Sequence, residues 1–150
     1  LAHREQGLMT APGNPKMIHS LVDLADQDVT LINRNLGSGT RLWLDNHLRA
    51  ENIPIESIRG YDTSVSTHTA CANLIKTGKA DVALGLRASA YQFGLDFIPL
   101  FHERYDLVFM REQSTMVVPL IDTIQTRSFR RSVNALKGYD TSHTGEQILL

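Results

Sequence analysis

The chain has 150 residues, a formal net charge of −1 and an ordinary hydrophobic fraction of 42%. This length is typical of one domain that buries a core of its own. The near-zero charge argues against the basic face of a nucleic-acid-binding domain. The densest basic cluster is Arg127, Arg130 and Arg131, a pattern typical of the solvated side of a helix. We therefore expect no direct nucleic-acid contact from this segment.

Cysteine content and hydropathy bear on the compartment. The single cysteine, Cys71, excludes an internal disulfide and fits a reducing compartment, so a cytoplasmic location is expected. No apolar run reaches the length of a membrane span, and the start of the chain lacks the apolar region of a signal peptide. The first residue is Leu1 rather than Met, so a partial domain of a longer protein is expected over 1–150.

Strand-like and helix-like stretches alternate through the first third of the chain. The pattern predicts a short apolar strand, a helix, a buried strand and a second helix, in this order: 7–11, 17–25, 29–32 and 40–51. The run Asn52-Ile53-Pro54 ends the last of these, because the residue before proline disfavours helical geometry.

The middle and end of the chain repeat this alternation. A helix, a strand and a short helix are predicted at 66–76, 80–84 and 87–93. Two strands, at 97–101 and 105–110, are separated by a polar tripeptide at 102–104, and 117–136 is mostly helical. We expect the polar tail 138–146 to fray.

Alternating strands and helices predict an α/β fold with a largely parallel sheet. Ligands of such sheets bind beyond the carboxyl ends of the strands. The loops at 33–40 and 85–87 both follow strands, so they are the candidate ligand loops. The pentapeptide Gly-Tyr-Asp-Thr-Ser occurs at 60–64 and again at 138–142. Because its flanks differ, we interpret it as a coincidence rather than an internal repeat.

The stretch Gly37-Ser38-Gly39-Thr40-Arg41 carries the clearest chemistry, because it joins a strand directly to a helix. The first amides of a helix lack partners and lie at the positive end of its dipole. Glycines let an anion approach the backbone, the hydroxyls of Ser38 and Thr40 are donors, and Arg34 and Arg41 add full charges. The segment therefore predicts an anion site.

A purely structural interpretation of the same stretch stays open. Ser38 alone can serve as a helix N-cap, and the glycines can do no more than tighten the turn. The spacing differs from a P-loop, which needs Gly-Lys-Ser/Thr, and from the dinucleotide fingerprint, since there is a single Gly-x-Gly. Nucleotide hydrolysis is therefore not predicted.

A second hydroxyl-rich segment, 64–69, also leads into a helix. Ser66 and Thr67 are candidates to bind a ligand that faces the first site, with His68 as a pH-sensitive neighbour. Ordinary helix capping explains the same hydroxyls. His68 and Cys71 share a helical face, but two ligands without a third are weak evidence for a metal, so none is predicted.

Two further residues are single candidates. Tyr105 follows a polar tripeptide where a crossing strand would present its phenol to a cleft, and Arg87 follows Gly85 as a possible anion contact. No nucleophile elbow, carboxylate pair or histidine cluster forms a catalytic set. The sequence therefore predicts a binding protein rather than an enzyme, without a cofactor.

Taken together, the ordered motifs resemble the periplasmic-binding-protein-like domain of molybdate- and tungstate-related proteins. That domain is often fused to a helix-turn-helix regulator or to a molybdopterin-biosynthesis domain. The resemblance covers nearly the whole chain. The motifs that carry it are, in chain order, 4–8, 11–15, Asn33-Arg34, 37–41, Gly60-Tyr61, 94–100, 103–108 and 138–142.

The resemblance implies a type 2 periplasmic-binding-protein fold, with two α/β lobes joined by crossover strands around a ligand cleft. It implies that Ser38, Gly39 and Thr40 contact the ligand and that Arg41 pairs with the ligand or fixes the loop. Ser66 and Thr67 would face the same cleft, and Tyr105 would lie at the returning hinge. The early strands of the family's first lobe are absent, so we expect a second lobe, hinge strands and C-terminal helices, with the first lobe incomplete.

Two functions follow from this resemblance. The first is binding or sensing of a small anion, such as molybdate, tungstate or a molybdenum-cofactor-related ligand. The second is an effector or dimerisation module of a transcription regulator with a degenerate cleft. An incomplete lobe exposes a sheet edge and apolar surface, so self-association into a homo-oligomer is expected.

Overall fold

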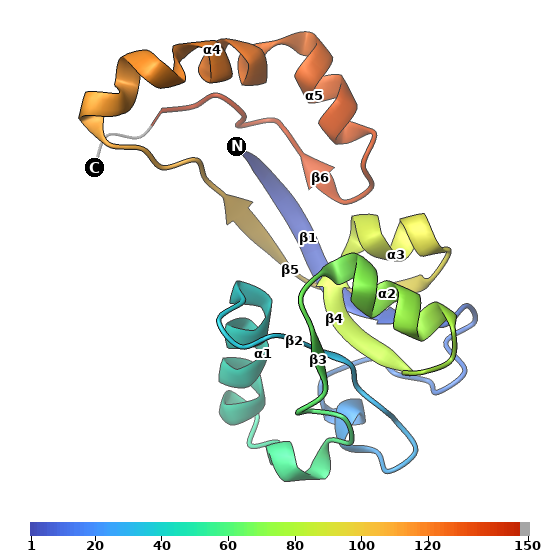
Figure 1. The fold of residues 1–150 in the computed structure, drawn as a ribbon. Helices are drawn as coiled ribbons and strands as arrows, with labels where there is room; N and C mark the ends of the chain where they lie inside the picture. The colour runs from blue at the N-terminus through green and yellow to red at the C-terminus, as the bar shows by residue number, and fades with distance from the viewer. Residues whose placement is uncertain (148–150) are drawn as a thin grey trace.

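The computed structural model describes residues 1–147 and shows two parts joined by two long strands. The strands β1 (Ala2–Thr10) and β5 (Asp96–Tyr105) pair antiparallel along their whole length. Below them in Figure 1 lies a body made of a sheet and helices. Above them lies an arm, which consists of η3 (Arg111–Gln113), α4 (Ser114–Gln125), α5 (Arg127–Asn134) and β6 (Tyr139–Asp140).

The sheet of the body is mixed, so the predicted largely parallel sheet is wrong in one respect. The central strand β1 runs antiparallel to both of its neighbours, β5 and β4 (Val82–Leu86). Beyond β4, a parallel bridge from Leu31 to Val82 leads to the parallel pair β2 (Asn33–Arg34) and β3 (Ser64–Val65). Alternation of strands and helices indicates parallel neighbours within each unit, but it does not specify where the first strand enters the sheet.

Helices cover both faces of this sheet. Successive side chains on a strand point to opposite faces, and Leu8 and Met9 of β1 accordingly belong to two separate apolar clusters. Leu8 packs in the cluster of α1 (Gly39–Ala50), and Met9 packs in that of α2 (His68–Lys76) and α3 (Arg87–Phe93). Burial on both faces explains why all five residues of β4 are apolar or glycine and all are buried.

The bounds of the helices follow from their caps. Ser38 and Thr67 have extended backbone geometry and accept hydrogen bonds from the third residue of α1 and α2, respectively. Asn52, at φ 57°, lies just past the end of α1, and Gly94, at φ 69°, ends α3 in the left-handed region. The predictions at 40–51, 66–76 and 87–93 are thus confirmed to within two residues.

The predicted helix at 17–25 is largely wrong, because only the short 3₁₀ helix η1 (Val22–Ala25) forms there. The side chain of Asp23 accepts from the backbone of His19 and Ser20 and holds the segment in a turn. The apolar side chains whose spacing suggested a helix are still buried, and they belong to a packed loop: Ile18, Leu21 and Leu24.

Residues 97–110 do not form two strands. Instead β5 continues through the polar 102–104 as far as Tyr105, and 106–110 have no regular structure. Polar residues did not interrupt the strand because its second half lies outside the body, where side chains are exposed or half-buried. A second short 3₁₀ helix, η2 (Ile55–Ser57), follows α1.

The tail also differs from its prediction, because it is tied to β1. β6 pairs with His3 and Arg4, and the hydroxyl of Thr144 donates to the carbonyl of Leu1. Gly138 has a φ of 80°, and the N–H of Tyr139 after it donates to the carbonyl of Leu136. Gly60, with a φ of 82°, forms the same turn, in which the N–H of the following tyrosine donates to the carbonyl of Ile58. The repeated pentapeptide therefore shares a turn at its first two residues, without forming an internal repeat.

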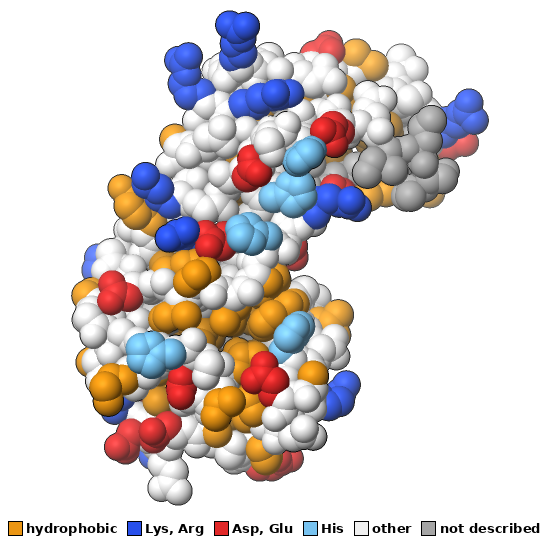
Figure 2. Space-filling model, turned by 180° about the vertical axis from the view of Figure 1, so that it is seen from behind, with side chains coloured by type: hydrophobic (Ala, Val, Ile, Leu, Met, Phe, Trp, Pro, Cys, Tyr) orange, Lys and Arg blue, Asp and Glu red, His pale blue; other side chains and the backbone are white. Residues whose placement is uncertain are grey.

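The arm exposes the apolar surface that an incomplete lobe predicts. Large apolar side chains are exposed on the segment that enters the arm and on α4: Leu107, Val108, Phe109, Met110, Met116, Val118 and Leu120. In contrast, apolar residues of the body are mostly enclosed between its sheet and helices. Figure 2 shows the narrowing between the two parts and the Lys and Arg side chains gathered at the far end of the arm.

Candidate anion-binding site

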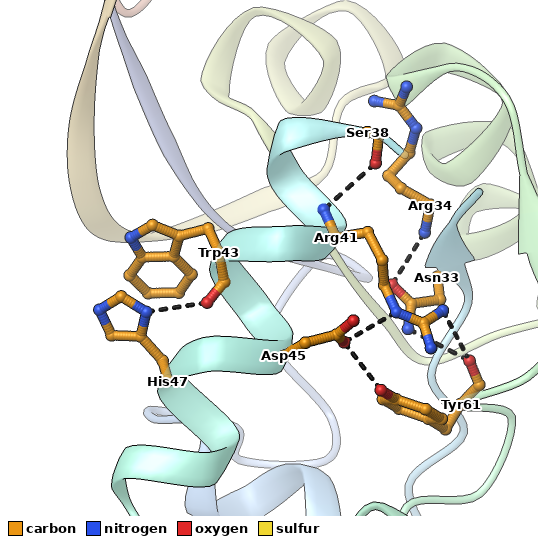
Figure 3. Close-up of polar contacts among 8 residues, drawn as sticks. All are labelled: Asn33, Arg34, Ser38, Arg41, Trp43, Asp45, His47 and Tyr61. Carbon is orange, nitrogen blue, oxygen red and sulfur yellow. Dashed lines mark hydrogen bonds and ion pairs between the residues drawn. The ribbon is translucent and has the colours of Figure 1, made fainter. Parts of the chain in front are cut away.

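The start of α1 presents unpaired donors to the surface. The hydroxyl oxygen of Ser38 accepts from the N–H of Arg41 at 3.2 Å, so its own hydrogen remains to be donated outward (Figure 3). Gly39, the first residue of the helix, is exposed and lacks the side chain that would cover the first amides. The start of α1 therefore leaves hydrogen-bond donors free at the positive end of the helix.

Arg34 joins this helix start to the next one. The parallel pairing of β2 with β3 places Arg34 opposite Val65, and its Nη2 donates to the carbonyl of Ser66 at 2.8 Å. The Nε of the same side chain is buried and has no hydrogen-bond partner within residues 1–147. A buried guanidinium N–H without an acceptor is costly, and the positive charge of this side chain favours a negative group nearby.

The start of α2 lies beside Arg34. Thr67 caps the helix by accepting from the N–H of Ala70 at 3.0 Å, and its hydroxyl pairs with that of Thr69 at 3.1 Å. Ser66 and Thr67 are both exposed. The sheet register therefore brings four sequence-predicted site residues together at two neighbouring helix starts: Arg34, Ser38, Ser66 and Thr67.

Thr40 and Arg41 face the interior. Thr40 is 5% exposed, and its hydroxyl donates to Oε1 of Gln6 at 2.9 Å, so its only hydrogen is already used. Arg41 is 6% exposed; its Nε bonds Asp45 at 2.8 Å and its Nη1 donates to the carbonyl of Tyr61 at 3.2 Å. Of the two roles that the resemblance allows Arg41, fixing the loop is the one its contacts support.

Tyr61 completes this anchor below the site. Its ring lies under the guanidinium of Arg41 at 4.0 Å, and its hydroxyl donates to Asp45 at 2.8 Å. Burial, and then the hydrogen bond to Asp45, raise the pKa of Tyr61 above its ordinary value. Figure 3 shows the three side chains closing one network on the side of α1 that faces β2.

Three site residues were missed from the sequence, and all lie on the long strands. The carboxylate of Glu103 accepts through Oε2 from Arg4 Nε and from Gln6 Nε2, both at 2.7 Å. Its other oxygen, Oε1, lies 3.7 Å from the position that a Cβ on Gly39 would take. The alternation of Arg4 and Gln6 places them on one face of β1, but only the strand register shows that Glu103 faces them.

His68 lies among these charges. Burial, together with the positive charges of Arg34 and Arg4, lowers its pKa to about 3. Its Nδ1 is buried without a partner in the described chain, and a Cβ on Gly85 would lie 3.3 Å from it. His68 is therefore neutral at physiological pH. Arg34 and Arg4 both lower its pKa, so the charges of these two arginines reach the same part of the chain.

Of the remaining candidates, Tyr105 contacts this cluster through Arg4, and Arg87 lies outside it. The ring of Tyr105, at the end of β5, lies 4.2 Å from the guanidinium carbon of Arg4 and is 49% exposed. Arg87 pairs with Glu5 at 2.6 Å. Burial raises the pKa of the Cys71 thiol to about 11, which makes it a poor metal ligand or nucleophile. Residues 1–147 hold no group of three or more His, Cys, Asp or Glu side chains placed for a metal.

The candidate site is an open wall rather than an enclosed cavity. Two surface cavities lie elsewhere. One, of about 390 Å³, is lined by residues that include Arg87 and Gly138, and the other, of about 290 Å³, by residues that include Asp45 and Tyr61. Neither is lined by Arg34 or Ser38. No helix in the described part of the chain is both long and apolar enough to cross a membrane.

Sequence comparisons find relatives for most of the chain. It is 34% identical over 146 residues to the uncharacterized protein YvgK of Bacillus subtilis, covering 97% of this chain and 47% of that protein. It is 38% identical over 108 residues to an uncharacterized protein from the 5′ region of a 2Fe-2S ferredoxin gene of Clostridium pasteurianum, covering 70% of this chain and 96% of that protein. The chain thus spans about half the length of the Bacillus relative.

Solved structures share the fold at low identity. PEB3 bound to L-phospholactate matches with a TM-score of 0.67 at 17% identity, over 93% of this chain and 66% of that one. An ancestral arginine-binding protein bound to arginine matches with a TM-score of 0.61 at 15% identity, over 91% and 61%. The type 2 periplasmic-binding-protein fold class is confirmed by these neighbours. Residues 1–125 match the PBP superfamily domain, and the chain belongs to that family.

Proposed function

We propose that the chain forms one wall of a binding site for a small anionic ligand. The observation that carries this proposal is Arg34, which lies on the strand that leads to α1 and donates to the residue before the cap of α2, while its Nε has no acceptor within residues 1–147. The dipoles of α1 and α2, the hydroxyl of Ser38 and the charges of Arg34 and Arg4 then favour negative charge at this wall. Arg41 and Thr40 act as positioning residues beneath the wall.

The ligand class is argued from the shape of this wall. Short hydroxyls, exposed amides and a guanidinium suit a compact group with several acceptor oxygens, such as a tetrahedral oxyanion or a carboxylate. Molybdate and tungstate, which the sequence resemblance implies, are such groups. L-phospholactate, which PEB3 binds, and arginine both carry a carboxylate. We therefore propose a small anion as the class of ligand for this chain, and not any one of these compounds.

Binding without turnover is part of the proposal. Several of the neighbouring structures are binding proteins, and one is an amino-acid-binding ancestor of a dehydratase. The titratable side chain at the wall, His68, has a pKa lowered to about 3, which makes it a weak general base at neutral pH. The ligand would be held by positive charge and hydrogen bonds alone.

The exposed apolar face of the arm favours a second candidate function. Exposed apolar surface marks an interaction site, and several large apolar side chains are exposed on α4 and the segment before it. An effector or dimerisation module would bury this face against a second copy. Sedimentation of the chain over a range of concentrations tests this, because a monomer that stays monomeric at high concentration contradicts it.

Calorimetry with paired variants tests the main proposal. Molybdate, tungstate, phosphate, L-phospholactate and arginine are titrated into the wild-type chain, Arg34→Gln and the control Arg59→Gln, whose exposed arginine lies in the turn before Gly60. We expect at least one anion to bind and to raise the Tm with concentration. Arg34→Gln should weaken that binding by about tenfold or more, as loss of a charged hydrogen bond implies, while Arg59→Gln should not. Absence of heat and of thermal shift with every compound contradicts the proposal.

A further inference from the structure

Glu103 places a negative charge where the proposed site is most positive. It comes from the hinge strand β5, directly opposite Arg4 of β1, and reaches the first residue of α1. Oε2 accepts two hydrogen bonds, whereas Oε1 accepts none from any described residue and faces the exposed Gly39. The wall therefore offers a ligand one unpaired acceptor beside its donors.

The carboxylate is held in place by a buried chain of hydrogen bonds. Gln6 is 1% exposed, and its amide oxygen accepts from Thr40. Its NH₂ group must then point the other way, toward Glu103. Because Arg4 also bonds Oε2, Glu103 would lose two charge-assisted hydrogen bonds by leaving the wall.

This fixed acceptor distinguishes two kinds of anion. An anion that has only acceptor oxygens brings negative charge next to Oε1 and receives no hydrogen bond from it, so the contact is repulsive. A carboxylate with a neighbouring hydroxyl or ammonium group can donate to Oε1 while its own oxygens meet Arg34 and the helix amides. An anion of the second kind gives a partner both to Oε1 of Glu103 and to Arg34.

We propose that Glu103 is a selectivity residue of the cleft, which favours carboxylates bearing an adjacent hydroxyl or ammonium donor over anions that only accept hydrogen bonds. This inference rests on the proposed function and narrows its ligand class. It assigns Oε1 of Glu103 to the donor group of the ligand and Arg34 to the carboxylate.

The ranking of ligands by the wild-type chain is the first test. L-lactate, L-alanine, propionate, molybdate and L-phospholactate are titrated, with binding followed by calorimetry and by the fluorescence of Trp43. Trp43 is the single tryptophan and its ring stacks on Phe101 of β5 at 4.0 Å. Lactate or alanine should bind at least about fivefold more tightly than propionate, as one charge-assisted hydrogen bond implies. Equal binding of lactate, alanine and propionate overturns the inference.

The second test removes the charge and keeps the shape. In Glu103→Gln, molybdate and L-phospholactate should gain about fivefold or more in affinity, while the advantage of lactate or alanine over propionate should shrink. Asp106→Asn is the matched control, since it removes one negative charge from an exposed pair with Arg104 and should leave the ranking unchanged. An unchanged ranking in Glu103→Gln overturns the role of Glu103, and the proposed function still stands if Arg34→Gln weakens binding. If no probe binds the wild type, the proposed function and this inference fail together.

Discussion

The body and the arm use their apolar residues differently. In the body, apolar side chains from β1, β4 and the helices fill two clusters on either face of the sheet. In the arm, Ile124 is the buried apolar residue of α4, while Met116, Val118 and Leu120 are exposed. The body therefore encloses most of its apolar side chains, whereas the arm leaves several of its large apolar side chains exposed.

The largest expected effect is the loss of a buried leucine from the body. Leu44 of α1 is fully buried, so Leu44→Ala should lower the free energy of unfolding by about 3 kcal/mol through lost burial and a cavity. Leu120→Ala in α4, where the side chain is 45% exposed, should change it by less than about 0.5 kcal/mol. Urea unfolding followed by circular dichroism measures both. Equal losses would mean that the arm is as tightly packed as the body.

A smaller effect is expected at the junction of the two parts. Gln6→Ala removes the amide between Thr40 and Glu103 and should cost about 2 kcal/mol, because two buried polar groups lose a partner. Glu146→Ala, which breaks an exposed pair with His143 in the tail, should cost less than about 0.5 kcal/mol. Thermal unfolding compares the two variants. A cost for Glu146→Ala that matches that of Gln6→Ala contradicts the ranking.

The pH dependence of stability should report on His68. Its folded pKa of about 3 lies below the ordinary 6.5, so the unfolded chain binds the proton more readily. This contribution to stability is complete above pH 6.5 and is lost as the pH falls toward 3, by up to about 1.4 kcal/mol per pH unit. The variant His68→Asn should lose this part of the slope. Urea midpoints measured between pH 7 and pH 4 test it, and a wild-type slope identical to that of the variant contradicts it.

The smallest expected effect lies in the pairing of the tail. β6 is two residues long and pairs only with β1 at the edge of the arm. We expect its amides to exchange with solvent faster than those of β4, which is buried between α-helices and β1. Hydrogen exchange measured by NMR tests this, and slower exchange in β6 would contradict the division into body and arm.

Local signals in the sequence were sufficient for the helices of the body. Ser38 and Thr67 mark where α1 and α2 begin, and Gly94 marks where α3 ends. They were not sufficient for 17–25, where helical spacing arises from a loop that packs its apolar side chains inward, held by Asp23. Periodicity reports which side chains are buried, and a packed loop buries side chains as a helix does.

The proximity of the candidate site residues was predictable in part. Arg34, Ser38, Ser66 and Thr67 lie at strand-to-helix turns, which the sequence reveals, and the structure places them together. The inward orientation of Arg41 depends on Asp45 one turn along the helix and on Tyr61 twenty residues away. Arg4 and Glu103 meet only through the register of β1 with β5, 99 positions apart. Long-range register is not encoded in local pattern.

The central claim is that the starts of α1 and α2 form one anion site, and amide NMR tests it most directly. When phosphate or L-lactate is added to the protein, the amide signals of Gly39 and His68 should shift together and follow one dissociation constant. The amides of Tyr91 and Lys137, beside the cavity of about 390 Å³, should stay unchanged. Shifts confined to that cavity, or to one helix start alone, would contradict the account.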